Sequence, residues 1–271
     1  MVSLLLEHGA DLNRPPKAVA PLQLASYANR VRVVRLLLER GANVNQTGAE
    51  GISALNVTSV AGHVDVATLL LEYGANVNER DEYGVSPLIA ASKDGHVRMV
   101  RLLLEYQADV NQTNTRDDVS PLGVASQNGH AAVVKVLLEN GARIDNGKSP
   151  LYAACENGHV SVVRMLLSRG ANVDLPIYTH GIYGATPLAV ASSAGHVEVV
   201  RLLIQTCDAN RLVLDGVTAV DVAREHGHAA VVRLLAPTIL DKLLAQRSDD
   251  LLVFREEYRT TKNCPRCSRR G

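Results

Sequence analysis

The chain has 271 residues, of which 46% are hydrophobic but only 3% aromatic, and its 28 basic and 28 acidic residues give no net formal charge. Neutrality removes any general attraction to nucleic acid or to a membrane surface, and no apolar run approaches the ~20 residues that a transmembrane helix needs. The first residues, MVSLLLEHGADLN, include Glu7 and Asp11 and have no basic start, so they are not a secretory signal. We therefore expect a cytoplasmic or nuclear protein without membrane insertion, whose four cysteines are free thiols.

One sequence unit recurs through most of the chain. A leucine that follows a turn dipeptide returns at steps of 33, 33, 34, 29, 37 and 32 residues, with valine in the last copy. These positions are Leu22, Leu55, Leu88, Leu122, Leu151, Leu188 and Val220. A Gly-His pair returns in step with them from the second copy onward. Self-similarity at such a period predicts an architecture of stacked repeats.

The copy from Val85 to Asn111 shows what each unit contains. Ser86-Pro87 supplies an N-cap hydroxyl and a proline at the first helical position, so a short helix begins there and continues to about Asp94. Gly95 supplies the left-handed residue that ends it, and His96 opens a second helix with a wide apolar surface. Two such helices cannot bury this surface alone, whereas stacked copies can. The sequence therefore predicts an all-α solenoid of helix–turn–helix units, with tight turns projecting at their tips.

These residues resemble the ankyrin repeat. The resemblance rests on the Thr/Ser-Pro-Leu start, the Ala-Ala or Ala-Ser pair, Gly-His, Val-Val-x-Leu-Leu-Leu and Gly-Ala-x-Val-Asn, and it covers about residues 1–235. One departure is systematic, because the family usually has histidine after Thr-Pro-Leu. This chain instead carries, in order, Gln23, Asn56, Ile89, Gly123, Tyr152, Ala189 and Asp221. The histidine that makes hydrogen bonds between repeats in the family is therefore replaced in every repeat of this chain, so the same bonds do not follow from the resemblance.

The same pattern divides the chain into four parts. Residues 1–17 match only the second helix of a repeat, residues 18–235 form seven repeats, 236–247 form a C-terminal capping helix, and 248–271 form a basic, disordered tail. A start in mid-unit indicates a truncated longer protein or a gene prediction that begins late. The turn after repeat four is four residues shorter than usual and the turn after repeat five is four longer, so the two changes cancel and the helices can keep their register. In repeat three, Gln107 replaces the glycine that ends the second helix.

Three other motifs are weaker. Gly141 to Ser149 reads GARIDNGKS, but a phosphate-binding loop needs four residues between its glycines and a preceding strand, so we interpret it as a repeat junction. The histidines of the Gly-His pairs are too far apart to share a metal, and we expect them to orient the helix starts through hydrogen bonds. Cys264 and Cys267 have zinc-ribbon spacing but supply only two of four ligands, so we expect no bound zinc. We predict no catalytic residues, no cofactor and no small-molecule substrate.

The resemblance implies a protein-interaction scaffold or adaptor that binds a partner on its concave surface. In the family that surface is made from turn tips and first-helix positions. The matching tip positions are Glu50, Ile52, Glu82, Tyr83, Val85, Arg116, Asp117, Val119, Lys148 and Tyr183. The matching first-helix positions are Tyr27, Lys93, Asp94, Gln127, Asn128, Glu156, Asn157 and Glu225. The resemblance also marks Asn45, Asn78 and Asn111 as candidates for asparagine hydroxylation.

The charges of these positions predict the chemistry of the partner. Six of them are acidic and three are basic, whereas Arg35, Arg101, Lys135, Arg164, Arg201 and Arg233 recur at one position on the outer side of the second helix. We therefore expect a partner with a basic, extended segment, with Tyr83 and Tyr183 as aromatic anchors. Two alternatives remain open. The array could be the targeting part of a larger protein, such as a ubiquitin-ligase receptor, kinase or channel, or a nucleic-acid factor acting through the basic tail, which neutrality disfavours.

Overall fold

The computed structural model describes residues 11–13, 19–147, 149–174, 186–206 and 218–236, together with the backbone of 177–179 and 182–185. Residues 1–10 and 14–17 of the expected partial repeat (1–17), residues 237–247 of the expected capping helix (236–247) and the whole expected tail (248–271) lie outside these residues. Lys148, the side chain of Tyr183 and the Cys264–Cys267 pair lie outside them as well.

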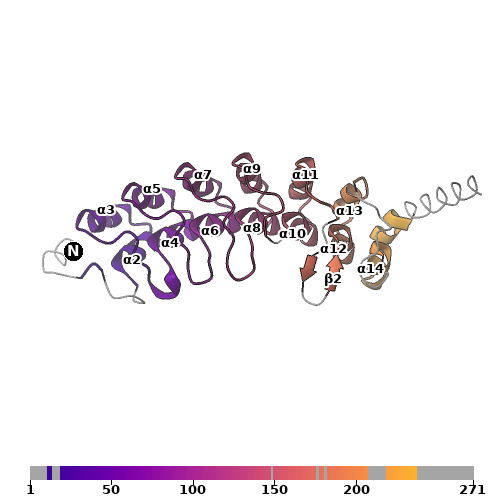
Figure 1. Cartoon of the computed structure of the whole chain (residues 1–271), viewed down its shortest axis with the longest axis horizontal. Coiled ribbons are helices and arrows are strands. Elements are labelled where there is room, and N and C mark those ends of the chain that lie inside the picture. The colour runs from indigo at the N-terminus through magenta and orange to yellow at the C-terminus, as the bar shows by residue number, and fades with distance from the viewer. Residues whose placement is uncertain are drawn as a thin grey trace, which may run out of the picture.

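The described chain folds into consecutive helix pairs. The first helices are α2 (Pro21–Tyr27), α4 (Ala54–Ala61), α6 (Pro87–Lys93), α8 (Pro121–Gln127), α10 (Pro150–Glu156), α12 (Pro187–Ser193) and α14 (Ala219–Glu225). The second helices are α3 (Val31–Glu39), α5 (Val64–Glu72), α7 (Val97–Glu105), α9 (Ala131–Glu139), α11 (Val160–Ser168) and α13 (Val197–Leu203), and residues 229–236 are also helical. Figure 1 shows the second helices along a bowed upper edge, the first helices in a row beneath them, and the turns projecting below. The predicted solenoid is confirmed.

The first helices begin as their sequences predict. The Ser86 hydroxyl accepts a hydrogen bond from the backbone N–H of Ile89, and Pro87 occupies the first turn of α6. Thr186 caps α12 in the same way. The N-terminal N–H groups of a helix have no partner within it, so a hydroxyl at this place both satisfies one of them and fixes where the helix starts.

The Gly-His pairs join neighbouring repeats, because the hydrogen bonds expected of the histidines at the helix starts run to the preceding repeat. His130 precedes α9 without capping it, and its Nε2 atom lies 2.9 Å from the carbonyl oxygen of Lys93, at the end of α6. Its ring also lies against Gly95, where an added Cβ would come within 2.7 Å of Nδ1. Gly95 is therefore needed both for its φ of +75° and for the space that the next repeat's histidine fills.

Amide side chains supply contacts between repeats that the sequence left undecided. At the position where the family has histidine, Gln23 donates a hydrogen bond to the carbonyl of Ile52, and Asn56 donates one to the carbonyl of Val85 at 3.1 Å. The side-chain oxygens of these residues also accept hydrogen bonds. Gln23 accepts one from the N–H of Ala20, and Asn56 accepts one from the N–H of Ser53, the N-cap residue of α4. A buried amide has both a donor and an acceptor, so it can replace the histidine bridge in repeats one and two.

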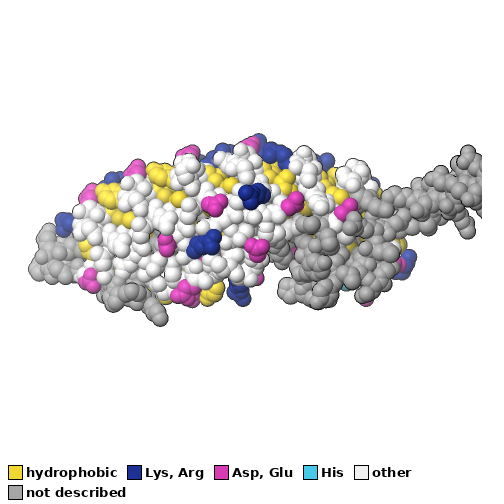
Figure 2. Space-filling view, in the orientation of Figure 1, with side chains coloured by type: hydrophobic (Ala, Val, Ile, Leu, Met, Phe, Trp, Pro, Cys, Tyr) yellow, Lys and Arg dark blue, Asp and Glu magenta, His cyan; other side chains and the backbone are white. Residues whose placement is uncertain are grey.

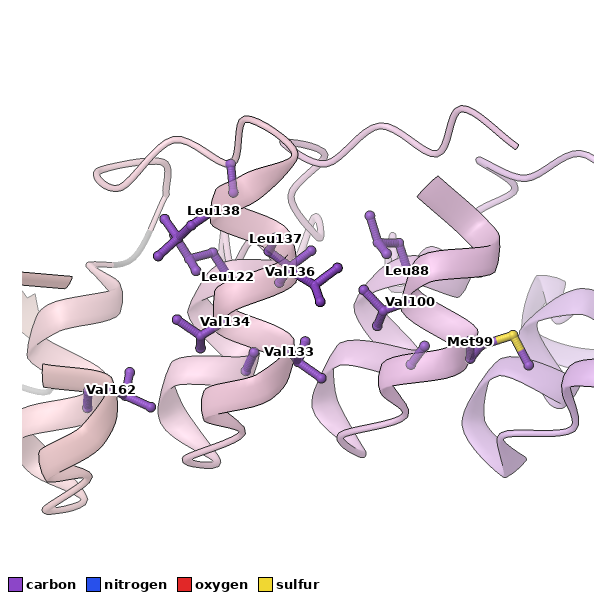
Figure 3. Close-up of a cluster of buried hydrophobic side chains, with 14 of the residues drawn as sticks. Leu88, Met99, Val100, Leu122, Val133, Val134, Val136, Leu137, Leu138 and Val162 are labelled. Carbon is purple, nitrogen blue, oxygen red and sulfur yellow. The ribbon is translucent and has the colours of Figure 1, made fainter. Parts of the chain in front are cut away.

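The hydrophobic core runs through the whole stack. Figure 3 shows side chains of α6, α7, α8 and α9 packed together, including Leu88, Leu122 and Leu137. Leu103 and Leu137 are both fully buried, as the repeat pattern predicted. Because each first helix contacts the first helix of the next repeat, every unit depends on its neighbour to cover its apolar side.

The turn tips are connected to one another. The N–H of Glu82 donates to the carbonyl of Glu50 at 2.8 Å, and the N–H of Thr115 donates to the carbonyl of Tyr83 at 3.1 Å. The lengthened turn after repeat five differs from the others, because its extra residues form an antiparallel hairpin of β1 (Ile177–Thr179) and β2 (Ile182–Ala185). α10 still contacts α12 across it, so the stack continues.

A ladder of asparagine side chains links the ends of the second helices. The side-chain oxygen of Asn45 accepts a hydrogen bond from the N–H of Asn76, and that of Asn111 accepts one from the N–H of Arg143. Asn78 bonds to the N–H of Asp109 in the same way. The sequence marked these three asparagines only as hydroxylation candidates, and the structure gives them a role in holding successive repeats together.

Candidate functional site

The turn tips and the exposed sides of the first helices form one continuous surface, which we call the concave face. Most of the site residues predicted from the sequence lie exposed on it. The exposed ones are Tyr27, Glu50, Glu82, Tyr83, Lys93, Asp94, Arg116, Asp117, Gln127, Asn128, Glu156, Asn157 and Glu225. Ile52 and Val85 are half-buried and Val119 is buried, so these three support the tips more than they present a side chain to solvent.

The concave face is hollowed at its N-terminal end by two adjoining cavities of about 230 Å³ each. Tyr27, Ile52 and Val57 line both cavities. The first cavity is also lined by Val19, Gln23, Leu24, Gly48 and Ala49. The second is also lined by Asn56, Val60, Ala61, Asp81, Val85 and Ala90. We call the two together the apolar groove. It combines Tyr27, Ile52 and Val85, which the sequence had placed in the binding surface.

Sequence reasoning missed the other apolar members of this groove. Leu24 is 58% exposed and Val60 is 53% exposed, which is unusual for aliphatic side chains on helices that bury most of their apolar surface. The available signal was a comparison down one column of the repeats. Five residues after the repeat leucine, repeats one and two carry Tyr27 and Val60, whereas later copies carry Lys93 and Gln127 at that position.

The remaining concave face is polar. Asp94, Glu156 and Glu225 are exposed at the C-terminal ends of their first helices. Asn128 and Asn157 lie there too, where each side-chain amide donates to a carbonyl of its own helix, at 2.8 Å and 2.9 Å. These side chains can accept hydrogen bonds from a partner, and the carboxylates can attract positive charge.

Charge differs between the two sides of the array. On the concave face the exposed acids predicted from the sequence are Glu50, Glu82, Asp94, Asp117, Glu156 and Glu225, and the exposed bases described there are Lys93 and Arg116. The row of Arg and Lys at the second helices is also exposed, and acidic groups accompany it. Glu139 lies 3.9 Å from Lys135 and Glu198 lies 3.6 Å from Arg201. Figure 2 shows both signs along the upper edge, so the outer side is mixed rather than basic.

A second hollow, of about 530 Å³, lies at the turns between the two helices of repeats one to three. His63 and His96 line it, but their Nε2 atoms already bond to the carbonyls of Tyr27 and Val60. Their ring nitrogens therefore hold the repeats together. Within the described ranges, no group of three or more His, Cys, Asp or Glu side chains is arranged to hold a metal ion.

The comparisons with known proteins agree with the geometry. The family profile described as ankyrin repeats (3 copies) matches residues 45–114, 109–177 and 176–243, and the single ankyrin repeat profile matches residues 20–49. The crystal structure of the human ASB11 ankyrin repeat domain matches with a TM-score of 0.71 and 31% sequence identity, over 80% of this chain and 98% of that chain. No curated protein sequence matches this chain.

In the part of the chain that the structure describes, no helix has both the length and the apolar character needed to cross a bilayer. The periodic helix pairs, the Gly-His contacts between them and the family profiles agree over most of the sequence. The chain is a member of the ankyrin repeat family.

Proposed function

We propose that this chain is a non-enzymatic scaffold or adaptor that binds a partner protein through its concave face. Ankyrin arrays are generally protein-interaction modules, and the apolar groove is the observation that carries the proposal for this chain. Monomeric proteins rarely leave neighbouring Leu, Val and Tyr side chains in an open hollow without a partner. The exposed acids beside it favour a partner with basic residues. We also propose, from the sequence, that the protein acts in the cytoplasm or the nucleus.

Affinity capture with charge-reversed variants tests this function. The full chain is immobilised as the wild type, as Glu82→Lys/Asp117→Lys on the concave face, and as Arg101→Glu/Arg164→Glu on the outer side. We expect the outer variant to retain the bound partner and the concave variant to lose it, because only the first leaves the acidic surface intact. A partner lost with the outer variant and kept with the concave variant would place binding on the second helices and contradict the proposal.

A second role is that the array serves as the targeting part of a larger protein, such as a ubiquitin-ligase receptor, kinase or channel. The matched human structure supports this role in one respect: it is an ankyrin repeat domain, and a domain is one part of a protein. Transcript sequencing upstream and downstream of this reading frame distinguishes the roles. An additional catalytic or membrane domain in the same frame would support the targeting role. Transcripts without such a domain would favour the scaffold or adaptor role.

A further inference from the structure

The concave face is divided into two chemically different parts along the stack. In repeats one and two the first-helix side chains that line the groove are apolar: Leu24, Tyr27 and Val60 are exposed, and Val57 is half-buried. In repeats three to five, the position of Tyr27 and Val60 and the position after it carry exposed polar or charged side chains instead. These are Lys93 and Asp94, Gln127 and Asn128, and Glu156 and Asn157. The boundary lies between α4 and α6, so a ligand that crosses it meets two kinds of surface.

The apolar part is built to take side chains. Its two cavities each enclose about 230 Å³ and share the wall formed by Tyr27, Ile52 and Val57. Tyr27 is 71% exposed, so most of its ring is available to a partner. Glu50 and Glu82 stand on the joined turn tips beside the cavities. An apolar side chain that enters the groove would remove this surface from water, and acidic residues would lie beside it.

The repeat geometry sets the spacing of a matching ligand. Packed helices are about 8–10 Å apart, and an extended chain advances about 3.3 Å per residue. One repeat therefore corresponds to about three residues of an extended segment. Asp94 lies one repeat beyond Val60, and Glu156 lies two repeats beyond Asp94, so positive charges on a ligand would face them about three and about nine residues past the second cavity.

We propose, building on the function proposed above, that the concave face binds an extended segment of a partner protein with two bulky apolar residues about three positions apart, followed on one side by Lys or Arg. The apolar pair occupies the two cavities. The basic residues lie over repeats three to five, opposite Asp94, Asp117 and Glu156. The proposed ligand is thus a segment that is apolar at one end and basic at the other. This is a more specific class of ligand than the basic, extended segment expected from the sequence.

A library of random peptides of about 16 residues, displayed on phage, tests this on the full chain. Selection on the wild type is counter-selected on Leu24→Ser/Val60→Ser, which removes exposed apolar side chains without touching the core. Tyr73→Ser/Tyr106→Ser is the matched control, because these tyrosines are exposed at the ends of α5 and α7, outside the groove. We expect enriched peptides to carry the spaced apolar pair with Lys or Arg on one side.

A synthetic copy of an enriched peptide then gives the quantitative result by fluorescence anisotropy. The groove variant should weaken its binding about 10-fold or more, and the tyrosine control should change it less than about 2-fold. Asp94→Lys/Glu156→Lys should weaken the basic peptide and favour a copy with Glu in place of its Lys and Arg.

The inference would be overturned if the enriched peptides lacked the apolar pair with Lys or Arg on one side. It would also be overturned if Leu24→Ser/Val60→Ser bound the peptide as tightly as the wild type. Sedimentation that shows a dimer of the wild type which Leu24→Ser/Val60→Ser dissociates would overturn it as well, since the groove would then hold a second copy of this chain. The affinity-capture experiment proposed above tests the acidic residues of the turn tips, and it leaves the groove unchanged. If Glu82→Lys/Asp117→Lys loses the captured partner but the peptide selection fails, this inference is wrong and the proposed function still stands.

Discussion

At the scale of single residues, Gln107 is held in a conformation that suits glycine. It has a φ of +64° at the end of α7, where Gly74 and Gly141 stand in the neighbouring repeats with φ of +84°. A side chain with a Cβ costs roughly 1–2 kcal/mol in the left-handed region. The backbone of the array thus dictates this conformation even where the residue opposes it.

Gln107→Gly should therefore stabilise the protein, by about 0.5–1 kcal/mol, measured by urea melts followed by circular dichroism. Gly141→Ala is the matched reverse change, because nothing lies within 4 Å of an added Cβ there and only backbone strain is introduced. It should lower stability by a similar amount. Equal stability of all three proteins would show that the turn relaxes to accept either residue.

The ionised carboxylate of Asp221 supports the start of α14. The Thr218 hydroxyl donates to its carboxylate at 2.6 Å, the Thr218 backbone N–H donates at 3.0 Å, and Arg224 lies 3.1 Å away. The hydrogen bonds from Thr218, with a smaller contribution from the charge of Arg224, hold the pKa of Asp221 below its ordinary value. The charged form is thus preferred in the folded state, and it completes the cap at the start of α14.

A lowered pKa means that this carboxylate stabilises the fold at pH values above about 4, the ordinary range for aspartate, and that its contribution is lost as pH falls through the lowered value. Repeat seven should therefore loosen on acidification. We expect amide exchange in α14, measured relative to α8 at the same pH, to rise in the wild type as pH falls below about 4. In Asp221→Asn, α14 should exchange faster already at neutral pH and show less change with acid. Identical pH profiles for both proteins would refute this role.

At the scale of helices, burial between repeats provides most of the stability. Leu103 of α7 and Leu137 of α9 have no exposed surface. Leu103→Ala or Leu137→Ala should each cost ~2–5 kcal/mol in a denaturant melt, because each leaves a cavity shared by neighbouring units. Leu24→Ala is the control, since its exposed side chain contributes little to the core. Neutral results for both leucines would mean that the repeats stack in another register.

The first helices also carry a column of buried serines. In the described part of the chain, the hydroxyls of Ser26, Ser59, Ser92, Ser126 and Ser192 are buried without a hydrogen-bond partner. Cys155 occupies the same position in repeat five and is fully buried. A small side chain is needed there for the helices to approach, but the polarity of the hydroxyl has no matching partner.

Ser126→Ala should thus leave stability unchanged or raise it by up to about 1 kcal/mol, because the unpaired hydroxyl is removed and the size is kept. Ser126→Val is the opposing control, since the added methyl groups overpack the same site and should destabilise by about 1–3 kcal/mol. Thermal melts of the two variants measure the difference. A clear loss of stability in the alanine variant would show that the hydroxyl is bonded in solution.

At the scale of the whole molecule, zero net charge conceals an uneven distribution. The concave face carries more acids than bases, whereas the outer side mixes both signs. A surface of one sign raises the association rate of an oppositely charged partner, and salt screens this effect. If the proposed function is correct, charge should set how fast a partner associates, and the apolar groove should set how slowly it dissociates.

Glu82→Lys/Asp117→Lys should slow association of the captured partner and flatten its dependence on salt, measured by surface plasmon resonance at several ionic strengths. Arg101→Glu/Arg164→Glu should leave both nearly unchanged. Leu24→Ser/Val60→Ser should instead raise the dissociation rate with little effect on association. An association rate that ignores the acidic reversals would show that charge does not steer this encounter.

The sequence by itself determined the repeat period, the helix starts and the helix ends. These depend on neighbours in the chain, since Ser86 caps the helix that directly follows it and Gly95 ends that helix. The buried leucines followed from the same spacing. Tip and first-helix positions could be chosen from the family pattern, and the structure places most of them at the surface.

Only the tertiary structure decided what lies between repeats. The carbonyl that each histidine reaches and the use of Gln23 and Asn56 as bridges depend on how one unit sits on the next. The pairing of β1 with β2 was also absent from the repeat pattern. The apolar groove is the clearest case. Leu24, Val60 and Val85 come from three successive repeats and are unremarkable in each, and only the stacking brings them into one groove.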